Sequence, residues 1–270
     1  MVALYSEKET AAVEVSGLTK VIEDETVLEN VSFSFAKKGI HGILSPKGGG
    51  KTALLDILAC TSGYDEGSLT VNGTDIAFNG ADSKNAREVK KNIGYVRQRS
   101  EFYSEMTPIE ILNFVGSARK EEPDKLARQI KEALELVGLE EVSNRIVSRL
   151  GYVEQKMLGY AAAIVGTPDI LIIDEPKSKA TAEKNEVITG IIRLFGKRKT
   201  VILATEDYKT ARALCDDVVI ISDGRVLASG SFEELEDKLS RGDDSNGMTL
   251  ESLYMSLLKA SESGKNKGIR

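Results

Sequence analysis

The sequence predicts an α/β fold with a mostly parallel core sheet, an N-terminal antiparallel β layer and a helical subdomain. Three features predict it: short β-rich segments come first, helical segments fill the middle of the chain, and continuous apolar segments return after residue 167. Strands that alternate apolar and polar residues are typical of antiparallel layers, whereas continuous apolar strands are typical of parallel sheets covered by helices on both faces. We therefore expect a doubly wound sheet interrupted by a helical insertion.

The N-terminal third is expected to be rich in strands. Residues 31–35 read V-S-F-S-F, and this strict alternation predicts a half-buried strand of an antiparallel layer. A helix is predicted over residues 51–60, because Leu54, Leu55 and Leu58 recur at helical spacing after a glycine-rich loop. The other strands predicted in this part of the chain are 13–15, 40–44, 67–71 and 93–96.

The middle of the chain has the pattern of amphipathic helices. Residues 107–110 read T-P-I-E, which combines an N-cap threonine, a proline at the first helical position and a glutamate at the third, so a capped helix should reach about Ser117. Residues 124–137 repeat apolar side chains at helical spacing between charged residues. We assign residues 99–166 to the helical subdomain.

After this insertion the α/β pattern returns. Residues 170–173 read I-L-I-I, as expected of a central parallel strand. Further buried strands are predicted at 201–204 and 218–221, with a helix over 187–195.

We expect a single domain over residues 1–270. Its β layer and α/β core are assigned to residues 13–98 and 167–230, and a C-terminal helical tail to residues 231–270. Within this tail, residues 241–247 resemble a linker to a last helix near 250–259, and residues 261–270 are expected to be a frayed end.

The composition excludes several classes of protein. The chain carries 36 lysine and arginine residues against 42 aspartate and glutamate residues, a formal charge of -6 that disfavours a broad basic face for nucleic acid. No apolar stretch approaches the roughly 20 residues that span a bilayer. The two cysteines lie far apart in sequence and His41 is the single histidine, so a disulfide framework, a histidine-based metal cluster and a catalytic triad are not expected. We expect both thiols to be packed and inert and His41 to be structural. With no secretory signal in the first fifteen residues, a reducing cytosolic location is predicted.

A glycine-rich segment between a predicted strand and a predicted helix is the strongest functional signal. Residues 43–52 read I-L-S-P-K-G-G-G-K-T. In such a loop, backbone N–H groups approach a phosphate, the lysine reaches the β- and γ-phosphates, and the threonine hydroxyl binds Mg²⁺. The match to G-x-x-x-x-G-K-S/T is imperfect because Ser45 replaces the first glycine, and the competing interpretation is a glycine-rich turn with a surface lysine. The candidate nucleotide-binding residues are Ser45, Pro46, Lys47, Gly48, Gly49, Gly50, Lys51, Thr52 and Ala53.

Two further motifs belong with this loop. Residues 170–176 read I-L-I-I-D-E-P, which places Asp174 at the carboxyl edge of a buried strand, where α/β sheets bind ligands; Asp174 can hold Mg²⁺ and Glu175 can polarise water. Gln98 follows the strand I-G-Y-V at 93–96. These motifs and their order resemble the ATP-binding cassette (ABC) ATPase family over about residues 13–260, including the ending D-G-R-V-L-A-S-G at 223–230.

The resemblance implies a P-loop NTPase fold of the ABC type, with ATP and Mg²⁺ as cofactors. It implies that Lys51 holds phosphate, that Thr52, Asp174 and Gln98 hold the metal, and that Glu175 and Gln98 are catalytic. In that family the nucleotide subunit pairs head to tail with a second nucleotide subunit and drives an integral membrane permease. The chain would then be cytoplasmic and peripheral, attached to the inner face of the cell membrane through the permease.

The chain departs from the family at several motifs. The signature L-S-G-G-Q corresponds to L-G-Y-V-E at 150–154, or to S-R-L-G-Y at 148–152 in a shifted frame. Glu206 stands where the family has a histidine that contacts the γ-phosphate. Residues 177–182 lack the aspartate of the loop that crosses the dimer, and the aromatic residue that would stack on adenine near Val21 and Ile22 is missing.

These departures leave more than one function open. The first hypothesis is an ATP-binding subunit of an ABC transporter that couples ATP binding, and slow or partner-dependent hydrolysis, to a permease, as a homodimer or rather a heterodimer. The alternative is a nucleotide-binding but catalytically impaired regulatory or structural subunit of a membrane complex. Both hypotheses include nucleotide binding, so the rate of ATP hydrolysis distinguishes them. A partition-type ATPase is a third interpretation of the loop, but its extra lysine belongs one residue upstream and the helical insertion argues against it.

Overall fold

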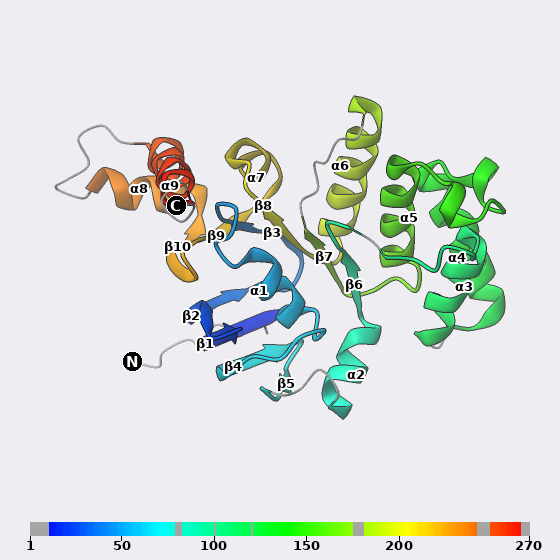
Figure 1. Ribbon diagram of the computed structural model, residues 1–270, viewed down its shortest axis with the longest axis horizontal. Helices are drawn as coiled ribbons and strands as arrows, with labels where there is room; N and C mark the ends of the chain where they lie inside the picture. Colours follow the sequence, from blue (N-terminus) through cyan, green and yellow to red (C-terminus); the bar gives the residue numbers. More distant parts are fainter. Residues whose placement is uncertain are drawn as a thin grey trace, which may run out of the picture.

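The computed structural model describes residues 11–78, 83–99, 101–119, 121–174, 181–241 and 249–265, and its elements form two sheets and a set of covering helices (Figure 1). The strands are β1 Val13–Ile22, β2 Glu25–Phe35, β3 Gly39–Leu44, β4 Glu66–Val71, β5 Thr74–Ile76, β6 Ile93–Val96, β7 Ile170–Asp174, β8 Thr200–Thr205, β9 Asp217–Ser222 and β10 Arg225–Ser231. The helices are α1 Lys51–Leu58, α2 Lys84–Lys91, α3 Pro108–Ala118, α4 Pro123–Val137, α5 Tyr152–Ile164, α6 Ala182–Gly196, α7 Tyr208–Leu214, α8 Phe232–Arg241 and α9 Leu250–Lys265, with short 3₁₀ turns at Glu140–Val142 and Val147–Arg149.

The smaller sheet is the antiparallel layer, with strand order β2-β1-β4-β5. Its first hairpin pairs Ile22 with Glu25, so the loop between β1 and β2 has two residues. Both of them, Glu23 and Asp24, have positive φ angles of 49° and 65°, which is the geometry of a type I′ hairpin turn. Burial alternates over the second half of β2, as predicted from V-S-F-S-F.

The larger sheet has the strand order β10-β9-β3-β8-β7-β6 and is parallel from β9 to β6, with β10 as an antiparallel edge. Alternate residues of its central strands belong to two different cores. Ile43 and Ile172 belong to the core shared with the antiparallel layer, α1 and α2, whereas Leu44 and Ile173 belong to the core shared with later helices. This double burial explains why the strands are continuously apolar, and it confirms the predicted parallel sheet.

The predicted helical subdomain consists of α3, α4 and α5, which lie between β6 and β7 in the chain and at one end of the molecule (Figure 1). The Thr107 side chain accepts from Glu110 N–H and Glu110 accepts from Thr107 N–H, so the predicted capping box is present. Arg119, just after α3, donates to the carbonyls of Ile93 and Ala163 at 3.0 and 3.2 Å. This residue ties the subdomain to the start of β6.

Several elements differ from the sequence-based expectation. Helix α2 was not predicted because it has only two apolar residues, Ala86 and Val89, which are too few to reveal a helical repeat. Strand β1 runs to Ile22 rather than stopping at residue 15, with register shifts that break its alternation. Helix α9 extends to Lys265, so the expected frayed end is wrong for residues 261–265. The expected linker falls mostly on residues 242–248, which lie outside the described residues.

Among the described residues, no helix has the length and apolar character needed to cross a membrane. Both cysteines are free and buried, as expected, and burial raises the pKa of the Cys60 thiol to about 11. Neither thiol is poised to react at neutral pH.

Candidate functional site

Three neighbouring strands of the core sheet bring the predicted site together at their carboxyl ends. Strand β8 lies between β3 and β7, with Leu44 paired to Thr205 and Asp174 paired to Ala204. The segments that follow these strands therefore meet at one edge of the sheet. They surround a cavity of about 330 Å³. Its lining residues are Val27, Lys47, Gly48, Gly50, Lys51, Thr52, Ala53, Gln98, Asp174 and Glu206.

The glycine-rich loop runs from β3 into α1, and two of its glycines are required by geometry. Gly50 is the N-cap of α1 with φ 97°, and a Cβ there would lie 2.6 Å from Leu28 Cδ2. A Cβ on Gly49 would lie 2.3 Å from Ser45 Oγ. The first N–H groups of any α-helix lack intrahelical acceptors, and a helix start opening on a cavity is a favourable place for an anion.

The Lys51 side chain is buried at the base of this cavity, with 7% of its surface exposed. Its ammonium group donates to the carbonyl oxygens of Ser45 and Pro46 at 2.7 and 3.0 Å and to Glu206 Oε1 at 3.3 Å. Ser45 and Pro46 thus contact Lys51 through their backbone carbonyl oxygens, and they are not among the residues that line the cavity. The ammonium is thus held beside the cavity, and an incoming anion would have to compete with these acceptors for its N–H donors.

Thr52 and Asp174 form the second polar pair of the cavity. Thr52 Oγ1 donates to Asp174 Oδ2 at 3.0 Å, and Asp174 is 2% exposed. Burial raises the pKa of the Asp174 carboxyl above its ordinary value, partly offset by the bond from Thr52 and the charge of Lys51. One hydroxyl and one carboxylate are the donor set that Mg²⁺ uses when phosphate and water oxygens complete its shell. Among the described residues, no group of three or more His, Cys, Asp or Glu side chains offers an all-protein metal site.

The remaining residues of the cavity and of the predicted site fall into three groups. Gln98, exposed just after β6, lines the cavity, as do Lys47, Gly48 and Ala53. Glu175, the predicted catalytic glutamate, lies outside the described residues, as does the rest of the loop to residue 180. Val27 lines the cavity without having been assigned to it from the sequence, and Glu206 lines it from the position where the resembled family has a histidine that contacts the γ-phosphate. The position of Glu206 also indicates the site, since it directly follows the buried strand β8, whose carboxyl end lies at the same edge of the sheet.

The altered signature segment lies at the start of α5. Gly151 is the N-cap of this helix, and its N–H donates to Glu154 Oε2 at 2.7 Å. Leu150 is buried, whereas Tyr152 is 52% exposed at the first helical position. The Glu154 carboxylate therefore satisfies the helix start from within the chain.

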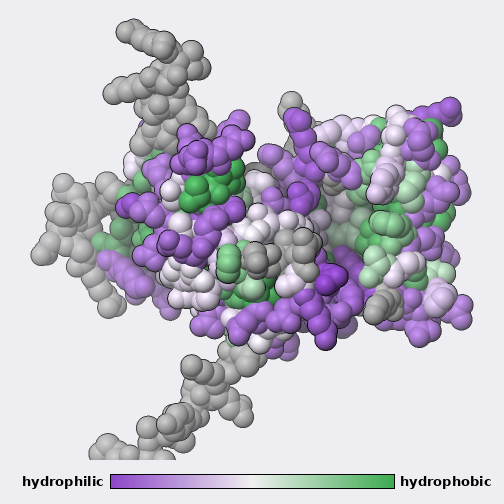
Figure 2. Space-filling model, turned by 60° about the horizontal axis from the view of Figure 1, so that its bottom comes forward, coloured by the Kyte–Doolittle hydropathy of each residue, from purple (hydrophilic) through white to green (hydrophobic). Residues whose placement is uncertain are grey.

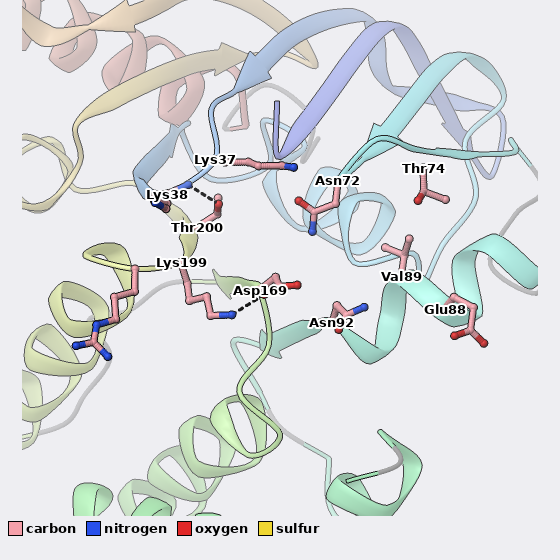
Figure 3. Close-up of a pocket in the computed structure, with 11 residues that line it drawn as sticks. Lys37, Lys38, Asn72, Thr74, Glu88, Val89, Asn92, Asp169, Lys199 and Thr200 are labelled. Carbon is pink, nitrogen blue, oxygen red and sulfur yellow. Dashed lines mark hydrogen bonds and ion pairs between the residues drawn. The ribbon is translucent and has the colours of Figure 1, made fainter. Parts of the chain in front are cut away.

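A larger cavity, of about 530 Å³, lies at the opposite end of the same sheet (Figure 3). Many of its lining residues directly precede strands of this sheet, and others come from α2 and from the β4–β5 hairpin. Both signs of charge are present: Lys37, Lys38, Arg198 and Lys199 face the same space as Glu88 and Asp169. Lys199 is held by Asp169 at 2.5 Å, and Lys38 N–H donates to Thr200 Oγ1 at 2.9 Å (Figure 3).

His41 belongs to this opposite end and has a structural role, as expected. It is 3% exposed, stacks on Phe35, and its Nδ1 and Nε2 lie 2.8 and 3.0 Å from Asp217 Oδ1 and Lys38 O. Burial lowers the pKa of His41, but the hydrogen bond and charge of Asp217 more than offset this, so the pKa lies above its ordinary 6.5.

Comparison with known proteins finds relatives that are similar in sequence. The sequence profile of the family described as "ABC transporter" matches residues 28–178, more than half of the chain. The methionine import ATP-binding protein MetN 2 of Salmonella paratyphi A is 31% identical over 205 residues, which are 75% of this chain and 60% of that protein. The sulfate/thiosulfate import ATP-binding protein CysA of Synechocystis is 26% identical over 223 residues, 82% of this chain and 61% of that protein. The chain thus spans less than two thirds of the length of these relatives.

Solved structures share the fold. A structure described as an ATP-binding subunit of an ABC transporter superimposes with a TM-score of 0.79 at 22% identity, covering 92% of this chain and 99% of that one. A dimeric ATP-binding cassette bound to ADP and Pi, in a post-hydrolysis state, superimposes with a TM-score of 0.73 at 22% identity, covering 81% and 98% of the two chains. At this identity the likeness establishes the fold.

Proposed function

The chain belongs to the ABC transporter family, and from this membership we propose that it is the ATP-binding subunit of a transporter, coupling ATP binding and slow or partner-dependent hydrolysis to a membrane permease. The proposal takes residues 1–270 as one domain, and it places the chain at the inner face of the cell membrane through that permease. The relatives are named as import ATP-binding proteins, which supports a role in transport.

One observation carries the proposal: Lys51, Thr52 and Asp174 line the same cavity at the start of α1. Lys51 and the N–H groups at the helix start would hold the phosphates of ATP, because both present positive charge to the same space. Thr52, Asp174 and Gln98 would hold Mg²⁺, which neutralises phosphate charge when bound. Glu175, directly after Asp174, would orient the attacking water.

We further propose that a second nucleotide-binding subunit completes the ATP site. In this arrangement a helix start of the partner covers the phosphates bound at Lys51, and α5 of this chain covers those of the partner. The start of α5 is poorly suited to that task, because Tyr152 replaces a small residue and Glu154 brings a negative charge. We therefore favour a heterodimer with a partner that has an intact signature segment. Such a heterodimer would have one ATP site competent for hydrolysis and one impaired ATP site.

The permease contact is assigned to the helical subdomain. Figure 2 shows hydrophobic residues gathered over the end of the molecule that this subdomain forms. Tyr103 and Phe114 are 67% and 58% exposed and pack edge to face with ring centroids 6.3 Å apart. Exposed aromatic pairs of this kind are enriched at protein interfaces.

The experiment is purification of the tagged chain from native membranes, followed by identification of its partners and measurement of ATP turnover. We expect an integral membrane protein and a second nucleotide-binding subunit in the complex, and turnover that Glu175→Gln abolishes. Phe114→Ser should release the permease without changing the ATP affinity of the isolated chain. A chain that purifies without any membrane protein and never hydrolyses ATP would contradict the proposal.

A further inference from the structure

Glu206 lines the phosphate cavity, and it stands where the family resembled in sequence has a histidine. It directly follows β8, and β8 lies between β3 and β7. Lys51 reaches the cavity from the loop after β3, and Asp174 reaches it from the end of β7. A terminal phosphate held by Lys51 on one side and by a metal on Asp174 on the other would therefore lie over the end of β8, where Glu206 is.

The Glu206 carboxylate is a counter-ion of Lys51. Its Oε1 lies 3.3 Å from Lys51 Nζ, which also donates to the carbonyls of Ser45 and Pro46. Of these three acceptors, the carboxylate is the charged one. Glu206 thus holds one of the lysine donors that a phosphate would need.

The backbone of Glu206 is fixed on both sides. Thr205 before it is buried and belongs to β8, and Asp207 after it caps α7 by accepting from Lys209 N–H. The Glu206 carbonyl itself accepts from Tyr254 Oη of α9 at 3.1 Å, and Tyr254 is fully buried. The Glu206 carboxylate therefore moves away from Lys51 by rotation of its side chain, which is 41% exposed.

We propose that Glu206 sets the nucleotide selectivity of this site by disfavouring the third phosphate. This inference rests on the proposed function. The γ-phosphate of ATP brings negative charge beside the carboxylate and competes with it for Lys51, whereas ADP leaves the place of the third phosphate to Glu206. Like charges a few ångströms apart repel, although the exposure of this carboxylate weakens the effect. The site then binds ATP with less advantage over ADP than Lys51, Thr52 and Asp174 alone would give.

The test measures the affinities of Mg-ATP and Mg-ADP by calorimetry on the full chain. Glu206→Gln keeps the shape and an acceptor for Lys51 but removes the charge. We expect it to tighten Mg-ATP about tenfold and Mg-ADP by much less, so that the ATP-to-ADP affinity ratio rises. Glu206→Asp, which keeps the charge and draws it back by one methylene, should give an intermediate ratio.

The matched control is Glu135→Gln in α4. It removes the same charge from an exposed glutamate paired with Lys131, outside the phosphate cavity, and should leave both affinities unchanged. Equal changes for both nucleotides, or an unchanged ratio in Glu206→Gln, would overturn the selectivity role while leaving ATP binding intact. If neither wild type nor Glu206→Gln binds either nucleotide, the proposed function itself fails.

Discussion

The two ends of the core sheet carry similar groups and use them differently. At the carboxyl ends of the strands, Lys51 and Asp174 line a cavity of about 330 Å³. At the amino ends, Lys199 and Asp169 line a larger one of about 530 Å³ (Figure 3). The smaller cavity has a glycine-rich loop, a helix start and a buried carboxylate beside it. The larger one has exposed charges that pair with each other.

Cavity size therefore does not decide which end of the sheet suits a phosphate. A binding site for a phosphate needs donors that remain oriented and partly desolvated before the ligand arrives. Lys51 meets this condition because the backbone carbonyls of Ser45 and Pro46 hold its ammonium group at low exposure, while Glu206 competes with a phosphate for one of its donors. Lys199, 35% exposed and paired with a half-exposed aspartate, does not. Substitutions at the two cavities can test this distinction.

Lys51→Ala should produce the largest change. A hydrogen bond to a charged group contributes about 1.5–3 kcal/mol, and this lysine should reach two phosphates, so the affinity for Mg-ATP should fall at least about a hundredfold. Calorimetric titration measures the loss, and a thermal unfolding curve close to that of wild type shows that the fold persists. Equal affinity in the two proteins would mean that the loop is not a phosphate site.

Asp174→Asn should act through the metal. The amide keeps an acceptor for Thr52 but binds Mg²⁺ poorly, so nucleotide affinity should fall about tenfold with Mg²⁺ present and hold or rise in its absence. Titrations with Mg²⁺ and with a chelator measure both. Burial raises the pKa of the Asp174 carboxyl, so in wild type the gain from Mg²⁺ should fade on acidification at a higher pH than for an exposed aspartate. An equal loss with and without Mg²⁺ would assign Asp174 a purely structural role.

The loop and Asp174 could be predicted from the sequence because their signals are local. A glycine-rich segment between an apolar strand and a helix, and an aspartate that ends an apolar strand, each lie within about ten residues. The Lys51–Glu206 pair joins residues 155 positions apart, so no local pattern contains it. Helix α2 and strand β10 could not be predicted for a different reason. Both bury few side chains, and a repeat of apolar residues is visible in a sequence only where one face of an element is buried.

His41→Gln should affect stability and leave nucleotide affinity unchanged, because His41 belongs to the beginning of β3 rather than its end. The pKa of His41 is raised in the folded state, so its favourable contribution is fully present below pH 6.5 and is lost as the pH rises through the folded pKa. We expect the variant to lose about 1–2 kcal/mol at pH 6 and less at pH 9. Urea unfolding at the two pH values measures this. A deficit that grows with pH would contradict the charged pair with Asp217.

Lys199→Gln should have the smallest effect, and it tests the comparison most directly. Lys199 lies at the larger cavity and pairs with Asp169 at 2.5 Å, but the two side chains are 35% and 53% exposed. Exposed ion pairs contribute about 0–1 kcal/mol, because solvent and salt screen the charges and both side chains lose conformational freedom. The free energy of unfolding should therefore change by less than about 1 kcal/mol, and less still at high salt. Mg-ATP affinity, measured in the same titration as for Lys51→Ala, should equal that of wild type. A fall in nucleotide affinity would show that charge at the amino ends of the strands contributes to binding, and the functional division between the two ends of the sheet would then be wrong.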